Sequence, residues 1–432
     1  MKKTKILLLA PVFALLVSCS KAPSNYDQVK KNLPSGGEEV AETADKGAAL
    51  LKIVNGVVDT LGESSQKHVL HLDASVNHVP LRLTEEEKAS EAEVYHDFAL
   101  NLDAEFAISV PQEGSSGLYF TVKDLDVSIS NFIDIKDVQL SLGYNHTAEK
   151  GAFLYVDLSN QNLLNAIGTV TTALGYESIG QTVTQLIGEG KIMLNADLLV
   201  KMVADLLPDF AEAGLLQLPD GMEIDQVVAQ LNGMTGKKID FLSMISGYIP
   251  NVLPMLKTMI SKYVSAETLN RGAELLKDYL SVATYKTEDV VTKYAAALNL
   301  SNEQFHGLVD PKEPEVTNAR RAEDGSENEP VAPSFPQVDV TKVTVDAGAM
   351  VAVGHNRGQV NEKMTLESIA VSLIGSFEDY SARLNLTEEA YYGDQVGFEP
   401  VSLEGYQNLT STVNLMLGSL EEMIRSMLPH NA

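Results

Sequence analysis

The sequence predicts an α+β fold in which a long, curled antiparallel sheet, half-barrel-like in shape, carries a large helical insertion and a C-terminal helix. Apolar and polar residues alternate before residue 158 and again after residue 338, which is typical of strands. Between these two parts the apolar residues recur at helical spacing. The longest alternating run, 94–110, would extend roughly 56 Å at about 3.3 Å per residue, and strands of such length normally bend.

Residues 1–18 have the order of an export signal. Basic residues come first, an apolar run of 12 residues follows, and Ser18 directly precedes Cys19, the only cysteine of the chain. The apolar run is too short for a membrane-spanning helix, which needs about 20 residues. The motif Leu16-Val17-Ser18-Cys19 resembles the lipobox of bacterial lipoproteins. Secretion after ordinary signal cleavage is the alternative.

The lipobox resemblance implies cleavage before Cys19 and acylation of this residue, so that palmitate-type chains hold the protein at a membrane. Ser20, rather than Asp, follows the cysteine, which in the enteric sorting rule favours the cell outer membrane. The resemblance covers about the first 20 residues of the chain. Residues 19–43 are rich in Pro, Gly and Ser and are expected to form a flexible tether.

The amino-acid composition limits the classes of partner that the protein can bind. Without residues 1–18 the chain has 414 residues, and loss of three lysines leaves 29 basic against 59 acidic residues, a formal charge of −30. Such a surface repels phosphate backbones, so we expect no nucleic-acid binding. With its one cysteine acylated, the mature chain has no disulfide, and burial and hydrogen bonds must stabilise it.

Residues 44–158 are expected to form one amphipathic helix, over 44–61, and then two long hairpins. Folding the alternating runs about a centre near Glu87 places 70 opposite 104, 72 opposite 102 and 74 opposite 100, so that apolar residues meet. In the second hairpin, Val138, Leu140, Leu142 and Tyr144 would face Leu154, Val156 and Leu158. The apolar face of the strand between them shifts by one residue near Lys123-Asp124, which indicates a bulge.

The helical region spans 159–309, with Ser159, Ser265, Thr287 and Ser301 as predicted helix caps. Helices are expected over 177–188, 196–207, 223–232, 240–263, 266–283 and 287–298. Pro250 and Pro254 should kink or split the segment 240–263. Seven methionines in this region fit either an ordinary core or an adaptable surface for apolar ligands.

Residues 310–337, rich in Pro and acidic residues, are predicted to be a linker and a nicking site. Residues 338–432 are predicted to form a β-meander and a closing helix over 402–428. These late strands could complete the early sheet or form a separate domain, and the pattern is compatible with both.

No catalytic, nucleotide or metal motif stands out, so the sequence predicts a non-enzymatic protein without a cofactor or metal. His68, His71, His78 and His96 cluster in the first hairpin, where 78 would lie opposite 96 and His71 would face Asp103. Two facing imidazoles make an incomplete zinc site, and cross-strand pairs are the simpler interpretation.

The leading functional hypothesis is an envelope lipoprotein that binds lipid or another apolar molecule between the curled sheet and the helices. The residues expected to line this site are Phe98, Leu100, Leu102, Phe106, Leu140 and Val156. The alternative is a surface or periplasmic module that binds an envelope protein or glycan through the convex polar face of the sheet or through loops 80–93 and 310–337. An exposed tyrosine patch would mark such a module; Tyr391-Tyr392 is a candidate, although the end of a strand is the simpler interpretation of this pair. A further interpretation is that the helices fill the concave side of the sheet completely, which would leave an ordinary core and no ligand cavity.

Overall fold

The fold was analysed in a computed structural model. It describes residues 38–40, 45–110, 115–173, 175–178, 180–181, 184, 190–215, 223–234, 240–287, 290–309, 342–355, 363–396 and 401–427. Cys19 and the predicted linker 310–337 therefore lie outside the described residues.

The described strands form one 14-stranded sheet. They are β1 (Glu38–Val40), β2 (Ser65–Pro80), β3 (Tyr95–Ser109), β4 (Ser116–Ile129), β5 (Ile133–Ile135), β6 (Leu140–Thr147), β7 (Gly151–Asp157), β8 (Lys191–Asn195), β9 (Leu280–Thr287), β10 (Val290–Leu300), β11 (Val343–His355), β12 (Met364–Phe377), β13 (Tyr380–Tyr392) and β14 (Gln407–Asn408). The described helices are α3 (Lys46–Thr60), α4 (Glu85–Ala89), α5 (Gln161–Ala173), α7 (Asp197–Glu212), α8 (Ile224–Met234), α9 (Phe241–Ser246), α10 (Ile249–Ser261), α11 (Ala266–Leu275), α12 (Asn302–Val309) and α13 (Thr410–Met427).

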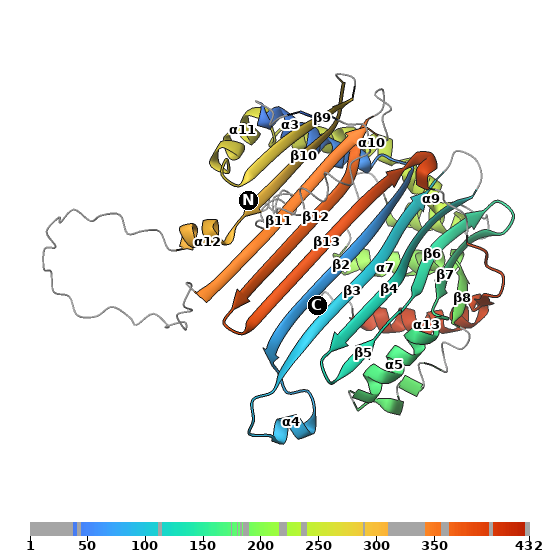
Figure 1. Cartoon of the computed structure of the whole chain (residues 1–432). Helices are drawn as coiled ribbons and strands as arrows, with labels where there is room; N and C mark the ends of the chain where they lie inside the picture. Colours follow the sequence, from blue (N-terminus) through green and yellow to red (C-terminus); the bar gives the residue numbers. More distant parts are fainter. Residues whose placement is uncertain are drawn as a thin grey trace, which may run out of the picture.

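The sheet joins the early and late parts of the chain. Its strand order is β1-β9-β10-β11-β12-β13-β2-β3-β4-β6-β7-β8-β14, with β5 paired to β4. The seam between the two parts is the β13–β2 pair, in which Leu386 lies opposite Leu72. The fold is thus α+β with a long curled sheet, and helices α3, α7, α9, α10 and α13 lie behind it in Figure 1. The late strands complete the early sheet.

The predicted registers of the early hairpins are confirmed. Leu70 pairs with Ala104, Leu72 with Leu102 and Ala74 with Leu100, while α4 occupies the turn around Glu87. In the second hairpin Leu142 pairs with Val156 and Tyr144 with Leu154. Lys123 is the unpaired residue where the β3–β4 register shifts, so the predicted bulge is also confirmed. Cross-strand matching of apolar side chains therefore specifies this part of the sheet.

The predicted pairing of His78 with His96 is wrong. The β2–β3 register shifts between Val76 and Val79, and Val79 is the residue that pairs with His96. His78 has a φ of 62°, and its backbone N–H donates to Asp97 Oδ1 at 2.8 Å. The sequence pattern does not reveal this bulge, because the extra residue shifts the pairing of β2 with β3 without changing the types of residue in either strand.

Two predicted helices, 266–283 and 287–298, are wrong in part or in whole. Helix α11 ends at Leu275, and β9 and β10 then form a hairpin. The run Ala295–Ala297 favours a helix by intrinsic propensity, but tertiary packing overrides it. All three alanines are buried, Ala296 on the face that carries α3 and its two neighbours on the opposite face. Residues 159–309 are therefore not purely helical, since they also contain β8.

Some of the predicted helix caps and the predicted split of segment 240–263 are confirmed, and other predicted caps are wrong. Ser265 caps α11, and Ser301 and Gln304 form the predicted reciprocal capping pair of α12. The segment 240–263 is split into α9 and α10, as its prolines predict. Thr287 instead ends β9, and Asn160 rather than Ser159 accepts the Leu163 N–H at the start of α5, at 2.8 Å. Ser159 donates to Asp157.

The largest described core lies where α3 packs on β9, β10 and β11. Ala49, Leu50 and Ile53 of α3 contact Val282, Ala296 and Val353. Gly56 permits this close approach, since a Cβ there would lie 2.9 Å from the Val353 Cβ. The buried Thr60 hydroxyl fixes the end of the helix by accepting the Leu366 N–H at 2.9 Å. The sheet is therefore covered firmly at its β9–β11 side.

None of the described helices combines the length and apolarity that crossing a membrane requires.

Candidate functional site

The six residues predicted to line an apolar site share one face of the sheet. Phe106 pairs with Phe120, Phe120 with Leu142 and Leu142 with Val156, so one apolar row crosses four strands. A neighbouring row joins Ala104, Val122 and Leu140. Leu102, Leu100 and Phe98 continue the same face along β3, opposite Leu125, Val127 and Ile129. The structure therefore brings all six side chains together.

This apolar face is only partly covered. None of the six side chains is buried, and Phe106 is 36% exposed. Leu142 beside it and Val76 on β2 are both 42% exposed. Ala104 and Val122, which lie between larger neighbours, are buried. An apolar strip in the middle of a sheet of this size normally lies under helices, so its exposure leaves a surface open to an apolar molecule.

Helices border the strip on two sides. At one side α3 covers β9, β10 and β11. At the other, Phe241 and Leu242 of α9 pack against a core of Tyr144, Ala152 and Ala196. Since Tyr144 and Leu142 lie on the same face of β6, α9 contacts the sheet directly beside the open strip. The strip therefore lies between two regions of the sheet that helices cover.

A buried polar network holds α9 on the sheet. Asp240 Oδ1 accepts hydrogen bonds from the Ser116 hydroxyl at 2.6 Å and from the Leu242 and Ser243 N–H groups. Asp240 Oδ2 accepts from the Ser243 hydroxyl and lies 3.6 Å from His146 Nδ1. Burial alone would raise the pKa of Asp240, but the hydrogen bonds from Ser116 and Ser243 outweigh burial and lower it. The carboxylate is thus ionised and acts as the cap of α9.

The same network contains Ser, His and Asp but lacks the geometry of a hydrolase. Ser116 donates directly to Asp240, whereas a nucleophilic serine is hydrogen-bonded to its histidine base. Ser116 is also only 1% exposed, so a substrate has no access to its hydroxyl. The cluster is therefore structural.

The opposite, polar face carries a carboxylate cluster that the sequence analysis did not identify. One ligand atom each from Asp124, Asp126 and Asp137 lie within 4.8 Å of one another. The Asp137 N–H donates to Asp126 Oδ1 at 2.9 Å, and Asp137 has a φ of 54°. Burial and then the charges of Asp126, Asp137 and Asp103 raise the pKa of Asp124. The sequence signal for this cluster is the i, i+2 spacing of Asp124 and Asp126, which places both carboxylates on one face of β4 directly after the bulge.

The four histidines of the first hairpin have separate partners. His68 Nδ1 lies 2.7 Å from Glu388, and His71 Nδ1 lies 2.5 Å from Asp103, which confirms the predicted cross-strand contact. The buried His96 lies 2.9 Å from the Ser130 carbonyl oxygen, and the His78 ring stacks on Tyr95. Their side chains therefore do not converge on one point.

Tyr391 and Tyr392 are the last residues of β13, as the strand-end interpretation predicts, and they do not form a tyrosine patch. Tyr392 is buried, and its hydroxyl donates to the Leu366 carbonyl at 2.5 Å. Tyr391 lies beneath Lys67, and its hydroxyl donates to Glu389. The two side chains lie on opposite faces because they are consecutive in a strand.

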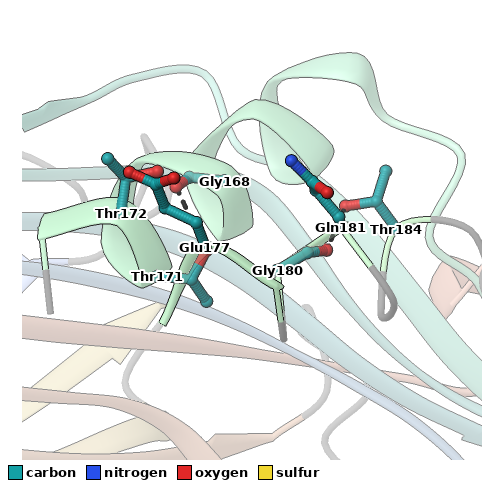
Figure 2. A pocket seen from close by; sticks show the side chains of 7 residues that line it. All are labelled: Gly168, Thr171, Thr172, Glu177, Gly180, Gln181 and Thr184. Atoms are coloured by element: carbon teal, nitrogen blue, oxygen red, sulfur yellow. Dashed lines mark hydrogen bonds between the residues drawn. The ribbon is translucent and has the colours of Figure 1, made fainter. Parts of the chain in front are cut away.

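A small pocket lies between α5 and the segment that follows it, and none of its lining residues belongs to the apolar strip. Its volume is about 320 Å³, and Figure 2 shows its lining by Gly168, Thr171, Thr172, Glu177, Gly180, Gln181 and Thr184. Gly180 allows the close approach, since a Cβ there would lie 2.0 Å from the Thr171 hydroxyl oxygen. The lining residues are glycines, threonines, a glutamine and a glutamate, and none of them has a large apolar side chain.

Comparisons with known proteins assign no family. No family model matches the chain, and no curated protein matches it. Among solved structures, the translocator domain of the autotransporter NalP from Neisseria meningitidis is similar over 81% of this chain and 98% of its own, at 8% identity and a TM-score of 0.18. A similarity at that TM-score supports no functional argument.

Proposed function

We propose that this chain is a non-enzymatic envelope lipoprotein, anchored through Cys19, that binds a lipid or another apolar molecule on the inner face of its half-barrel-like sheet. One observation carries the proposal: the apolar strip around Phe106 and Leu142 stays partly exposed while helices cover the sheet on both sides of it. The anchor and the outer-membrane location come from the lipobox and from Ser20.

The shape of the strip suits an elongated apolar ligand. Residues of β2, β3, β4, β6 and β7 contribute to it, and its rows run both across and along the strands. Covering such a strip removes apolar side chains from water at roughly 25 cal/mol for each Å² buried. No charged side chain is needed for this attraction, so the ligand would be recognised by its apolar part.

Extraction of the purified protein followed by mass spectrometry of the released lipid tests whether a ligand is bound. A fluorescent fatty acid titrated into delipidated protein then tests where it binds. Leu142→Asp places a charge in the strip and is expected to reduce affinity by about tenfold or more, since one tenfold step is about 1.4 kcal/mol and a buried Leu contributes at least that much.

Ile374→Asp is the matched control. Ile374 is 49% exposed and lies on the opposite face of the sheet, because its neighbour Leu373 pairs with Leu384 on the apolar face. This variant should bind the fatty acid like the wild type. Equal loss in both variants, or no binding by the wild type, would contradict the proposal.

A further inference from the structure

Helix α10 and the residues at its two ends carry an exposed apolar stripe. Tyr248, Val252, Met255, Met259 and Tyr263 follow helical spacing and therefore lie along one side. They are 64%, 51%, 61%, 43% and 55% exposed. A row of five large apolar side chains in water is unusual on a monomeric surface and marks an interaction site.

The stripe points away from the rest of the molecule. On the opposite side of α10, Lys257 pairs with Asp59 of α3, and Leu253 lies against Gly62 just after that helix. The inner side of the helix is therefore already packed, and the stripe is its outer side.

Charge distinguishes this surface from the rest of the chain. The whole chain has 21% charged residues and a formal charge of −27, yet none of the 16 residues from Phe241 to Leu256 is charged. Tyrosine occurs at both ends of the stripe, and tyrosine is favoured where a protein meets the interface of a bilayer because its ring is apolar and its hydroxyl polar. Methionine adapts its shape to an irregular apolar surface.

The chain that follows the predicted anchor at Cys19 enters the sheet at the end near which α10 packs. Glu39 of β1 pairs with Tyr285, and the row continues through Lys293 and Gly354 to Thr365. Thr365 is next to Leu366, which bonds to the end of α3, where α10 packs. Glu38 lies 19 residues after Cys19, so the chain between them can extend at most about 65 Å, at up to about 3.5 Å per residue. An acylated Cys19 would thus keep α10 within reach of the membrane.

We propose that α10 docks on the surface of a lipid bilayer, with the stripe Tyr248, Val252, Met255, Met259 and Tyr263 inserted among the lipids. The helix would lie in the plane of the interface, in keeping with its 13 residues. This inference rests on the proposed envelope function and adds to it the element that contacts the source of the lipid.

Vesicle flotation tests the inference. The mature chain, beginning at residue 19 and carrying Cys19→Ser, is mixed with electroneutral phosphatidylcholine vesicles, so that neither an acyl chain nor charge attraction contributes. The unlipidated chain is expected to float with the vesicles at low and high salt alike. Val252→Asp and Met255→Asp should each weaken this binding by about tenfold or more, because each stops one large apolar side chain from inserting.

Val203→Asp is the matched control, since Val203 is a 44% exposed valine on α7. It should float like the parent chain, and unchanged circular dichroism should show that all variants fold. Failure of the parent chain to float, or equal loss in the control, would overturn the inference. Dimerisation would also overturn it. If the parent chain sediments as a dimer, the α10 variants sediment as monomers and none of them binds vesicles, then the stripe joins two copies of the chain.

Fatty-acid binding by the same preparations separates this inference from the proposed function. A chain that binds the fatty acid but not vesicles contradicts only the role of α10. A chain that binds vesicles but no apolar ligand contradicts the function proposed for the strip.

Discussion

Asp124, on the polar face of β4, carries a charge that the fold disfavours. Its Oδ1 atom is shielded from water and has no hydrogen-bond partner among the described residues. Burial and three neighbouring carboxylates raise its pKa above the usual 3.8. The folded state therefore binds a proton here more readily than the unfolded chain, and ionisation costs stability as the pH rises through the raised pKa.

We expect Asp124→Asn to increase the melting temperature at pH 7 and to have no effect at pH 3, where the aspartate is already protonated. Calorimetry at both pH values measures the difference. Asp134→Asn is the control, because Asp134 is exposed and pairs with Lys136 at 3.0 Å. A lower melting temperature for Asp124→Asn at pH 7 would show that the cluster is stabilised in some other way.

The residues of the apolar strip could be predicted from sequence, but their exposure could not. Period-two alternation predicts which side chains share a face, and Phe106, Leu140 and Val156 do share one although they lie far apart in the chain. Exposure depends on where the helices pack, and no local pattern specifies that α9 packs near Tyr144 and leaves Leu142 exposed. The exposed Met255 and Met259 fit the adaptable-surface interpretation of the methionines.

Among the elements, α3 has the most extensive described packing. Ile53 is 4% exposed and contacts the core over β9, β10 and β11. We expect Ile53→Ala to lower the free energy of unfolding by about 2–5 kcal/mol, because truncation removes buried methyl groups and leaves a cavity. Urea denaturation measures the loss.

Lys52→Ala is the control within the same helix, since Lys52 is exposed and its replacement should change stability by less than about 0.5 kcal/mol. Equal effects of the two substitutions would mean that α3 is not packed on the sheet as described.

Sequence patterns predict the strands correctly where apolar and polar residues alternate, and incorrectly where small apolar residues follow one another. The strands β2, β3, β6 and β7 alternate clearly, and their predicted registers are correct except beyond the bulge between Val76 and Val79. In β10 both faces are buried, so small apolar residues follow one another and the alternation disappears. Ala295–Ala297 then looked helical, because alanine favours helices whenever packing does not decide.

At the scale of the whole molecule, strand pairing joins the two parts of the chain on either side of residues 310–337. The pairs β10–β11 and β13–β2 each connect a strand before this segment with one after it. We expect trypsin to cut at Arg320-Arg321 and the two fragments to stay together in size-exclusion chromatography until urea is added. Fragments that separate in native buffer would contradict the single sheet.

The central claim is that the apolar strip is an open surface that receives an apolar ligand. Cys19→Ser leaves the mature chain without cysteine, so one introduced cysteine can carry a polarity-sensitive fluorophore at a chosen site. The direct test compares Leu142→Cys, in the strip, with Ile374→Cys, on the opposite face, as fatty acid is added. Our account predicts that both sites react with the fluorophore and that only the probe at 142 shifts to shorter wavelength. A residue 142 that resists labelling, or probes that respond equally at both sites, would contradict it.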